Sequence, residues 1–319
     1  MFRPHEDPLF VVNPKLPCPH CNNERKQRKQ CDFCKHSGMK PINLSGMWHP
    51  SPGFLVCGGP SINKLPIEKL KDRGIVSLGV NNISGHVPID AWTFSDPQKK
   101  FHHGLFLDPK NITFAPIPKL KKHVRGKLPD GSFRIINKRV RDCPSVFGYE
   151  RKTIFYPEEF FSTEYGHWGM GGKQENRDFT CLCTMLLGIR LMHYLGCPKI
   201  YMLGVDFWMT KEEQYAFNQK KNARNGRYKK ENEMLKRLIP TFKKYNFEVY
   251  NCNPNSKCDV FPYISFDNAI ADCKGGVPEE PFDLSGWYDK GICNNYEKKY
   301  PKPIEILEFK KLLTNSKSI

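Results

Sequence analysis

The chain has 319 residues, of which 39% are hydrophobic and 13% aromatic, enough for a substantial core and too many for a disordered protein. Its formal net charge of +17 favours a polyanionic partner, although solubility alone or an acidic membrane surface would also account for it. No apolar run approaches the ~20 residues of a transmembrane helix, and the first residues lack the apolar region of a signal peptide. We therefore expect a cytoplasmic protein, in the host cytoplasm if the source is a virus.

Two C-x-x-C pairs stand near the N-terminus, at Cys18, Cys21, Cys31 and Cys34. Each such turn presents two thiolates to one point, and two turns complete a tetrahedral site. The pattern predicts one structural Zn²⁺, because a redox pair needs a single C-x-x-C and a disulfide framework does not suit the cytoplasm. The pairs resemble the short zinc modules of the DnaJ type, so residues 1–50 are predicted to form a zinc module and linker.

Three short apolar runs, at 54–57, 74–80 and 91–94, open the predicted core. A glycine turn follows the first run, and Ser61 is predicted to cap a helix that reaches Lys71. Strand, turn, helix and strand in this order predict an α/β fold, a Rossmann-like doubly wound and mostly parallel sheet.

Small polar residues follow each of these strands, at the edge where doubly wound sheets bind ligands. The glycines Gly58 and Gly59 could bring backbone N–H groups close to a phosphate, or they could simply make a tight turn. The loop is neither a Walker loop nor a G-x-G-x-x-G fingerprint. The residues that end the three strands are Gly58, Gly59, Ser61, Asn81, Asn82, Ser95 and Asp96.

Two stretches after the third strand are rich in charged or aromatic residues. Residues 98–152 are predicted to form a basic surface insertion that contacts nucleic acid, with a solvated face as the alternative. Residues 153–177 are aromatic and glycine-rich, which suits a lid over a ring-containing ligand or packing over the sheet edge.

The C-terminal half alternates predicted helices and strands. The expected elements are a helix over 180–195, a strand over 199–207, an amphipathic helix over 231–245 interrupted by Pro240, and a strand over 247–250. Together with the earlier strands they make residues 51–275 one Rossmann-like domain, followed by a C-terminal extension over 276–319. Basic regions at 119–141 and 220–230 are the predicted contacts to DNA or another polyanion.

Two groups of motifs, taken in order, resemble the bacterial sialyltransferase superfamily and its phage, archaeal and pterin-pyrophosphokinase-like relatives. The first group is Cys57-Gly-Gly-Pro-Ser-Ile62, the strand that ends at Asn81-Asn82, and Phe94-Ser-Asp-Pro97. The second is Thr184 to Gly196, Lys199 to Phe207, Tyr215-Ala-Phe217 and Phe247 to Ser256. The resemblance implies a Rossmann-like sheet that binds a nucleotide-activated sugar without an obligatory metal at the reaction centre.

The resemblance also implies which residues bind the nucleotide-sugar donor. The glycine loop matches the loop near the nucleotide phosphate, and Asn81 matches an asparagine that contacts the nucleotide. Ser95 stands where an asparagine plays a similar role, and Thr184 matches a serine near the donor. With the polar turn before Ser256, the predicted donor-binding set is Gly58, Gly59, Ser61, Asn81, Asn82, Ser95, Thr184, Asn253, Asn255 and Ser256.

The chain departs from the family at the histidine that serves as general base, because the matching region offers only Asn222, Asn225, Tyr228 and lysines. Neither the base nor the sialic acid donor therefore carries over. Asp96 is predicted as the base, since a carboxylate at the ligand edge can take the acceptor's proton, although it could merely cap the turn before Pro97. The rival candidates are the histidines His102, His103 and His167.

These observations predict a glycosyltransferase that moves a sugar from a nucleotide sugar to a hydroxyl acceptor, a hydroxymethylated base in bacteriophage DNA. An acceptor base within a duplex would have to be flipped into the site. Two alternatives stay open: a transferase that acts on surface glycans, and a non-catalytic DNA-binding protein built on an inactivated transferase fold.

Overall fold

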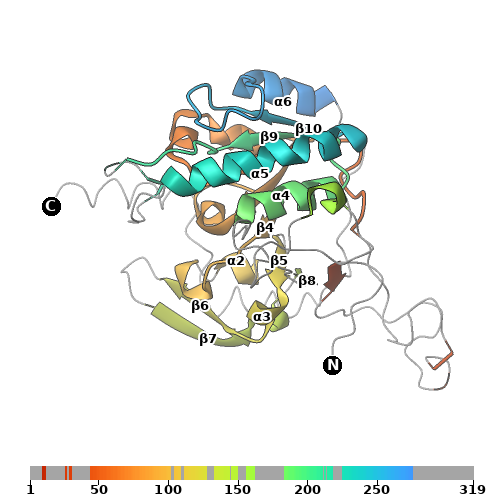
Figure 1. Cartoon of the computed structure of the whole chain (residues 1–319). Helices are drawn as coiled ribbons and strands as arrows, with labels where there is room; N and C mark the ends of the chain where they lie inside the picture. Colours follow the sequence, from red (N-terminus) through yellow and green to blue (C-terminus); the bar gives the residue numbers. More distant parts are fainter. Residues whose placement is uncertain are drawn as a thin grey trace.

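The structure is a computed structural model that describes residues 9–11, 26, 29–30, 44–101, 104–108, 111–127, 133–143, 145–149, 156–161, 183–210, 212, 214–217 and 225–275. Within these ranges, eight strands form one sheet in the order β1-β8-β5-β4-β3-β2-β9-β10. Figure 1 labels β4, β5, β8, β9 and β10 of this sheet. Only β1 is antiparallel to its neighbour, and every other pair in this sheet is parallel. The predicted α/β fold with a mostly parallel sheet is therefore confirmed.

The strands of this sheet are short and largely buried. They are β1 (Leu9–Val11), β2 (Gly53–Val56), β3 (Val76–Val80), β4 (Ala91–Thr93), β5 (Ile112–Pro116), β8 (Val146–Tyr149), β9 (Lys199–Leu203) and β10 (Glu248–Asn251). A sheet covered on both faces needs apolar residues at consecutive strand positions, and this explains the continuous apolar runs in the sequence.

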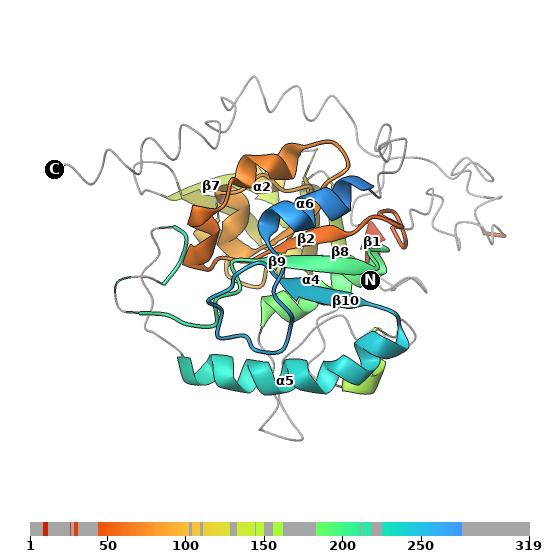
Figure 2. The ribbon, with the colours of Figure 1, turned by 90° about the horizontal axis from the view of Figure 1, so that it is seen from above.

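Helices cover both faces of the sheet (Figure 2). On one face lie α4 (Thr184–Tyr194) and α5 (Asn225–Lys244), which share a hydrophobic core with Leu55 of β2. On the other lie α6 (Phe266–Gly275) and the 3₁₀ turns η1 (Pro60–Lys64) and η2 (Ile67–Lys71). Phe54 and Val56 point to this second face, as the two-residue period of a strand requires.

The range 98–152, predicted as a basic surface insertion, instead supplies two strands of the main sheet. All residues of β5 and β8 are buried, and the charged residues that suggested an insertion lie before β5 or in the segments between these two strands. Between these strands lie α3 (Ile117–Leu120), the turn η5 (Val140–Asp142) and a separate antiparallel pair, β6 (His123–Lys127) and β7 (Phe133–Arg139). The short helices before β5 are η4 (Gln98–Lys100) and α2 (Gly104–Leu107).

The helix predicted over 231–245 is longer than expected and is not interrupted. It begins at Asn225, so part of the basic stretch 220–230 is helical, and it continues through Pro240. Proline has no backbone N–H, so the carbonyl four residues before Pro240 lacks its helical partner. Because Pro240 is exposed, this carbonyl can bond to water instead. Leu235, Leu238 and Phe242 are buried, as the pattern predicted. No helix among the described residues is long and apolar enough to span a membrane.

His193, near the end of α4, has an environment that couples folding to pH. Its ring stacks on Phe161 of the segment after η6 (Pro157–Glu159), with the ring centroids 3.8 Å apart. Burial lowers the pKa of His193 from 6.5 to about 4, with a smaller contribution from the charge of Arg190. Because the pKa is lower in the folded state, the unfolded state binds more protons between these two values, and stability is lost as the pH falls through that window.

We expect His193→Phe to reduce this acid sensitivity while keeping an aromatic ring in the stack. Thermal unfolding measured from about pH 8 to about pH 4 should show a smaller fall in Tm for the variant. The difference in unfolding free energy should be on the order of 2 kcal/mol at the acid end. Near pH 8, where the imidazole is neutral in both states, the pH-dependent term vanishes and gives the internal reference. Parallel curves for the two proteins would contradict the prediction.

Candidate functional site

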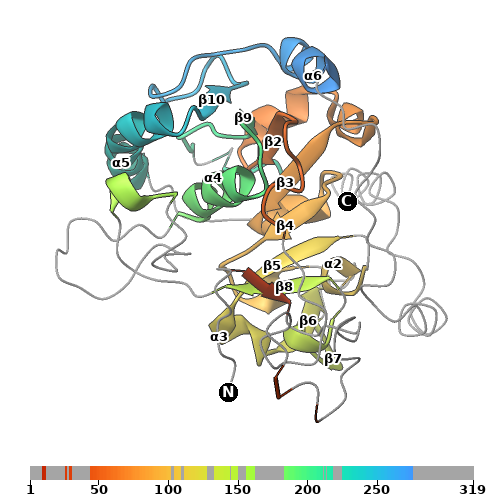
Figure 3. The same cartoon turned by 90° about the vertical axis from the view of Figure 1, so that its right-hand side faces the viewer.

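The order of the strands reverses at β2. The strands β3, β4, β5 and β8 lie on one side of β2, whereas β9 and β10 lie on its other side, so β2 marks the switch point of the sheet (Figure 3). Gly53 of β2 accordingly pairs with Val76 of β3 and with Ile200 of β9. The loops after β2 and β9 meet at the carboxyl edge of the sheet, which is where doubly wound folds bind ligands.

Asp206, in the loop after β9, joins the loops that follow three strands. Its carboxylate accepts hydrogen bonds from the Ser61 backbone N–H at 2.9 Å, from the Ser61 hydroxyl, and from Asn253 Nδ2 at 2.8 Å. Ser256 Oγ also donates to the carbonyl of Val205 at 2.6 Å. Asp206 is not among the predicted site residues, but the structure places it at the centre of this polar network.

The glycine loop is fastened to the same segment through its backbone. The N–H of Gly59 donates to the carbonyl of Gly204 at 2.8 Å, and the N–H of Cys57 donates to that of Leu203 at 2.8 Å. Ser61 lies within η1, whose N-cap is Gly59, so the carboxylate of Asp206 does the capping that was predicted for the Ser61 side chain. In this structure these N–H groups hold the loop in position, and phosphate binding there stays a prediction.

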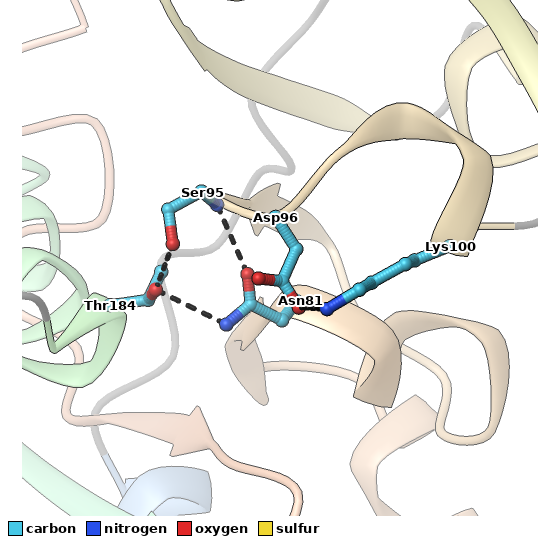
Figure 4. A network of polar contacts seen from close by, with 5 residues as sticks. All are labelled: Asn81, Ser95, Asp96, Lys100 and Thr184. Atoms are coloured by element: carbon cyan, nitrogen blue, oxygen red, sulfur yellow. Dashed lines mark hydrogen bonds and ion pairs between the residues drawn. The ribbon is translucent and has the colours of Figure 1, made fainter. Parts of the chain in front are cut away.

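A second cluster connects Asn81, Ser95 and Thr184 (Figure 4). Asn81 Nδ2 donates to Thr184 Oγ1 at 3.1 Å, and Asn81 Oδ1 accepts the backbone N–H of Ser95 at 3.0 Å. The hydroxyls of Ser95 and Thr184 are 2.6 Å apart. Asn81 adopts a left-handed backbone conformation (φ 53°), which asparagine tolerates better than most residues and which aims its side chain into the cluster. The cluster joins the ends of β3 and β4 to the start of α4.

Three stacked rings lie beside the glycine loop. The backbone N–H of Ala216 donates to the carbonyl of Gly58 at 3.0 Å, which brings Tyr215 and Phe217 against this loop. The Phe217 ring stacks on Tyr215 and, at a centroid distance of 4.5 Å, on His86. Sequence reasoning missed His86; its position directly after the turn η3 (Asn81–Gly85) was the available signal, and the contact with Phe217 could not be foreseen.

The structure brings the predicted donor-binding residues to one edge of the sheet. Ser61, Asn253 and Ser256 bond to Asp206 or to the adjacent Val205 and form the Asp206 network. Asn81, Ser95 and Thr184 bond to one another and form the Asn81 cluster. Gly58 and Gly59 lie in the glycine loop, Asn82 lies on η3, and Asn255 donates its backbone N–H to Asn253 Oδ1 at 3.0 Å. Asp96, the predicted base, follows Ser95 at this edge, but its carboxylate forms an ion pair with Lys100 at 2.8 Å.

Other predicted site residues lie outside the described residues. These are His102, His103, His167, Cys18, Cys21, Cys31 and Cys34. Seven of the 13 cysteines are described, all as free thiols, and six of these are buried. Within the described ranges, no group of three or more His, Cys, Asp or Glu side chains could hold a metal ion.

No model of a known protein family matches the chain, and no curated protein matches it significantly. Among solved structures, the sialyltransferase CstII from Campylobacter jejuni in complex with the substrate analogue CMP-3FNeuAc is similar at 12% identity and a TM-score of 0.36, over 78% of this chain and 99% of that chain. The same enzyme in complex with cytidine-5'-monophosphate matches at 13% identity and a TM-score of 0.34, over 78% and 98%.

Proposed function

We propose that the chain is a glycosyltransferase that moves a sugar from a nucleotide-sugar donor to a hydroxyl acceptor. One observation carries the proposal: the motifs that resemble the sialyltransferase superfamily lie far apart in the sequence but converge at the carboxyl edge beside the switch point. Displacement at an anomeric carbon needs hydrogen-bond donors for the leaving phosphate and a base for the acceptor. The hydroxyls of Ser95 and Thr184 and the amide of Asn253 lie at this edge, where they bond to one another or to Asp206, and they would orient the donor.

A thermal-shift screen against nucleotide sugars tests the donor. A ligand that binds only the folded protein must stabilise it, by about 2.7 kcal/mol at a hundredfold excess over Kd. We expect one class of nucleotide sugar to raise Tm, and its free nucleotide to raise Tm less. If no nucleotide sugar raises Tm, the proposal fails.

We infer that the acceptor is a hydroxymethylated base in DNA. The net charge of +17 supports a polyanionic acceptor, and exposed Lys229 and Lys230 lie near the start of α5, at the carboxyl edge of the sheet. Incubation with hydroxymethylated DNA and labelled nucleotide sugars should give labelled DNA, whereas unmodified DNA should stay unlabelled. Transfer to glycans alone would select the surface-glycan alternative, and DNA binding without donor binding would indicate an inactivated transferase.

Asp96 is the general base of the proposed reaction, and Asp96→Asn tests this role. The change is nearly isosteric and removes the proton acceptor, so turnover should fall by ~100-fold or more with donor affinity nearly unchanged. Steady-state turnover and donor titration measure the two effects separately.

The rival bases supply the matched variants for this test. Substitution of His102, His103 or His167, or of His86, which the structure adds as a candidate beside the glycine loop, should leave turnover within a few-fold of the parent. An active Asp96→Asn protein together with an inactive histidine variant would assign the base to that histidine.

We propose in addition that Cys18, Cys21, Cys31 and Cys34 bind one structural Zn²⁺. Two C-x-x-C pairs with this spacing support the assignment, since four thiolates fill the coordination shell. Metal analysis of native protein should find one zinc per chain, and Cys31→Ser should lower the zinc content and weaken polyanion binding while sparing the donor. Zinc-free native protein would overturn it.

A further inference from the structure

Trp208 is a large apolar side chain that the fold holds in solvent. It is 52% exposed, whereas its neighbours Phe207 and Met209 are each 7% exposed. Leaving an indole half in water forgoes much of the free energy that burial would supply. The residue stands two positions after Asp206, at the carboxyl edge of the sheet.

The backbone on both sides of Trp208 is fixed. Phe207 has a left-handed conformation (φ 53°), which costs an aromatic residue about 1–2 kcal/mol, and its ring stacks on Tyr228 of α5 at a centroid distance of 5.1 Å. On the other side, the Asn225 side chain accepts the N–H of Met209 at 2.9 Å and donates to its carbonyl at 3.0 Å. The exposure of Trp208 is therefore imposed by buried and hydrogen-bonded neighbours, as is common for strained backbone at binding sites.

The helix that clamps the segment of Trp208 carries basic side chains near its start. The clamp by Asn225 places Trp208 beside the first turns of α5, which carry exposed Lys229 and Lys230. The start of α5 and the loop after β9 lie at the same end of the sheet, on the left of Figure 2. Exposed aromatic and cationic side chains at one end of a sheet are the combination with which proteins bind single-stranded nucleic acid, by stacking on bases and pairing with phosphates.

We propose that Trp208 is a stacking platform for an unpaired nucleobase of the nucleic-acid acceptor. The platform rests on the proposed function only for the identity of that acceptor. An exposed indole can stack on a base only when the base is out of the duplex, so the platform takes single strands or a flipped nucleotide. Lys229 and Lys230 neutralise the flanking phosphates, which adds affinity without sequence preference.

Fluorescence anisotropy with two labelled single-stranded oligonucleotides of equal length, oligo-dT and a fully abasic strand, tests the platform. Trp208→Ala should weaken oligo-dT binding about tenfold or more and leave binding of the abasic strand unchanged, because only the first ligand has bases to stack. Trp208→Phe should retain most of the affinity. A combined Lys229→Ala and Lys230→Ala protein should lose affinity for both strands and show a shallower salt dependence.

Tyr156 provides the matched control. It is 50% exposed but adjoins η6, which packs at the other end of α5, where Thr241 Oγ1 donates to the carbonyl of Pro157 at 2.6 Å. Tyr156→Ala should bind both strands like the parent, and unchanged Tm would show that each variant is folded. Equal binding of oligo-dT by Trp208→Ala and the parent would overturn the proposal. It would also be overturned if Trp208→Ala lost affinity for neutral oligosaccharides but kept its affinity for oligo-dT.

The binding assay contains no sugar donor, so its outcome is separable from the proposed activity. If binding depends on Trp208 and on bases but the protein transfers no sugar, the proposed transferase activity is refuted and the stacking role of Trp208 is supported. If Trp208→Ala changes neither sugar transfer to DNA nor oligo-dT affinity, the stacking role of Trp208 is refuted and the transferase activity is supported.

Discussion

Gly59→Ala is expected to destabilise the fold by about 3 kcal/mol, the upper end of typical overpacking costs, and to abolish donor binding. An added Cβ would lie 2.5 Å from the carbonyl oxygen of Gly204 and 2.7 Å from the carboxylate of Asp206. The backbone of Gly59 is ordinary (φ −69°), so the cost is purely steric. Because the obstructing atoms belong to the loop after β9, the substitution would push apart the two loops at the switch point. Thermal unfolding and donor titration would measure both effects.

The adjacent glycine gives a matched control. A Cβ at Gly58 would lie 3.3 Å from the rings of Tyr215 and Phe217, which are side chains that can move. Gly58→Ala should therefore cost much less stability, and Gly226→Ala, with nothing within 4 Å of the added Cβ, should meet no steric obstruction. Equal stability of the Gly58 and Gly59 variants would show that the loops are not as closely packed as described.

Asp206→Asn should also have a large effect, a loss of about 3 kcal/mol of stability together with donor binding. The carboxylate accepts from two groups of Ser61 and from Asn253, and all three contacts are to a charged acceptor. An amide keeps one acceptor oxygen and turns an N–H₂ group toward the remaining donors, so at least one hydrogen bond is lost. Hydrogen bonds to charged groups contribute about 1.5–3 kcal/mol each.

A double-mutant cycle with Asn253→Ala tests the network directly. If Asn253 acts through Asp206, the two losses of stability should be non-additive, with a coupling of about 0.5–3 kcal/mol. Additive losses would mean that Asn253 and Asp206 stabilise the loops independently. Asn63→Ala, which removes a hydrogen bond to Ala216 outside the network, should show no coupling to Asp206.

The fold could be predicted where local pattern and tertiary structure agree. The runs that became β2, β3 and β4 are mostly apolar and buried, because both faces of the sheet are covered. The strands β5 and β8 were missed because charged turns surround them and hid two buried runs of four or five residues. The helix α6 was missed for a related reason: its stability comes from Phe266, Ala269 and Ile270 packing on the sheet.

The residues of the candidate site could be predicted from the sequence, whereas the hydrogen bonds between them could not. Strand-end residues such as Asn81 and Ser95 were predicted to gather because parallel strands end at one edge. Which side chains bond to one another could not be predicted, since Ser61 and Asp206 are 145 positions apart and meet only through the pairing of β2 with β9. The same reason explains why Asp206 is absent from the predicted site residues.

The pairing of β2 with β9 also sets the order in which the protein can mature during synthesis. Gly53 meets Val76 early, but its second partner is Ile200, so one side of β2 stays unpaired until β9 has left the ribosome. Such an open strand edge invites association with other chains, which gives nascent or truncated chains that stop before β9 a hazard that the finished protein lacks. The Asp206 network closes after that step, so the chain completes its candidate site only late in translation.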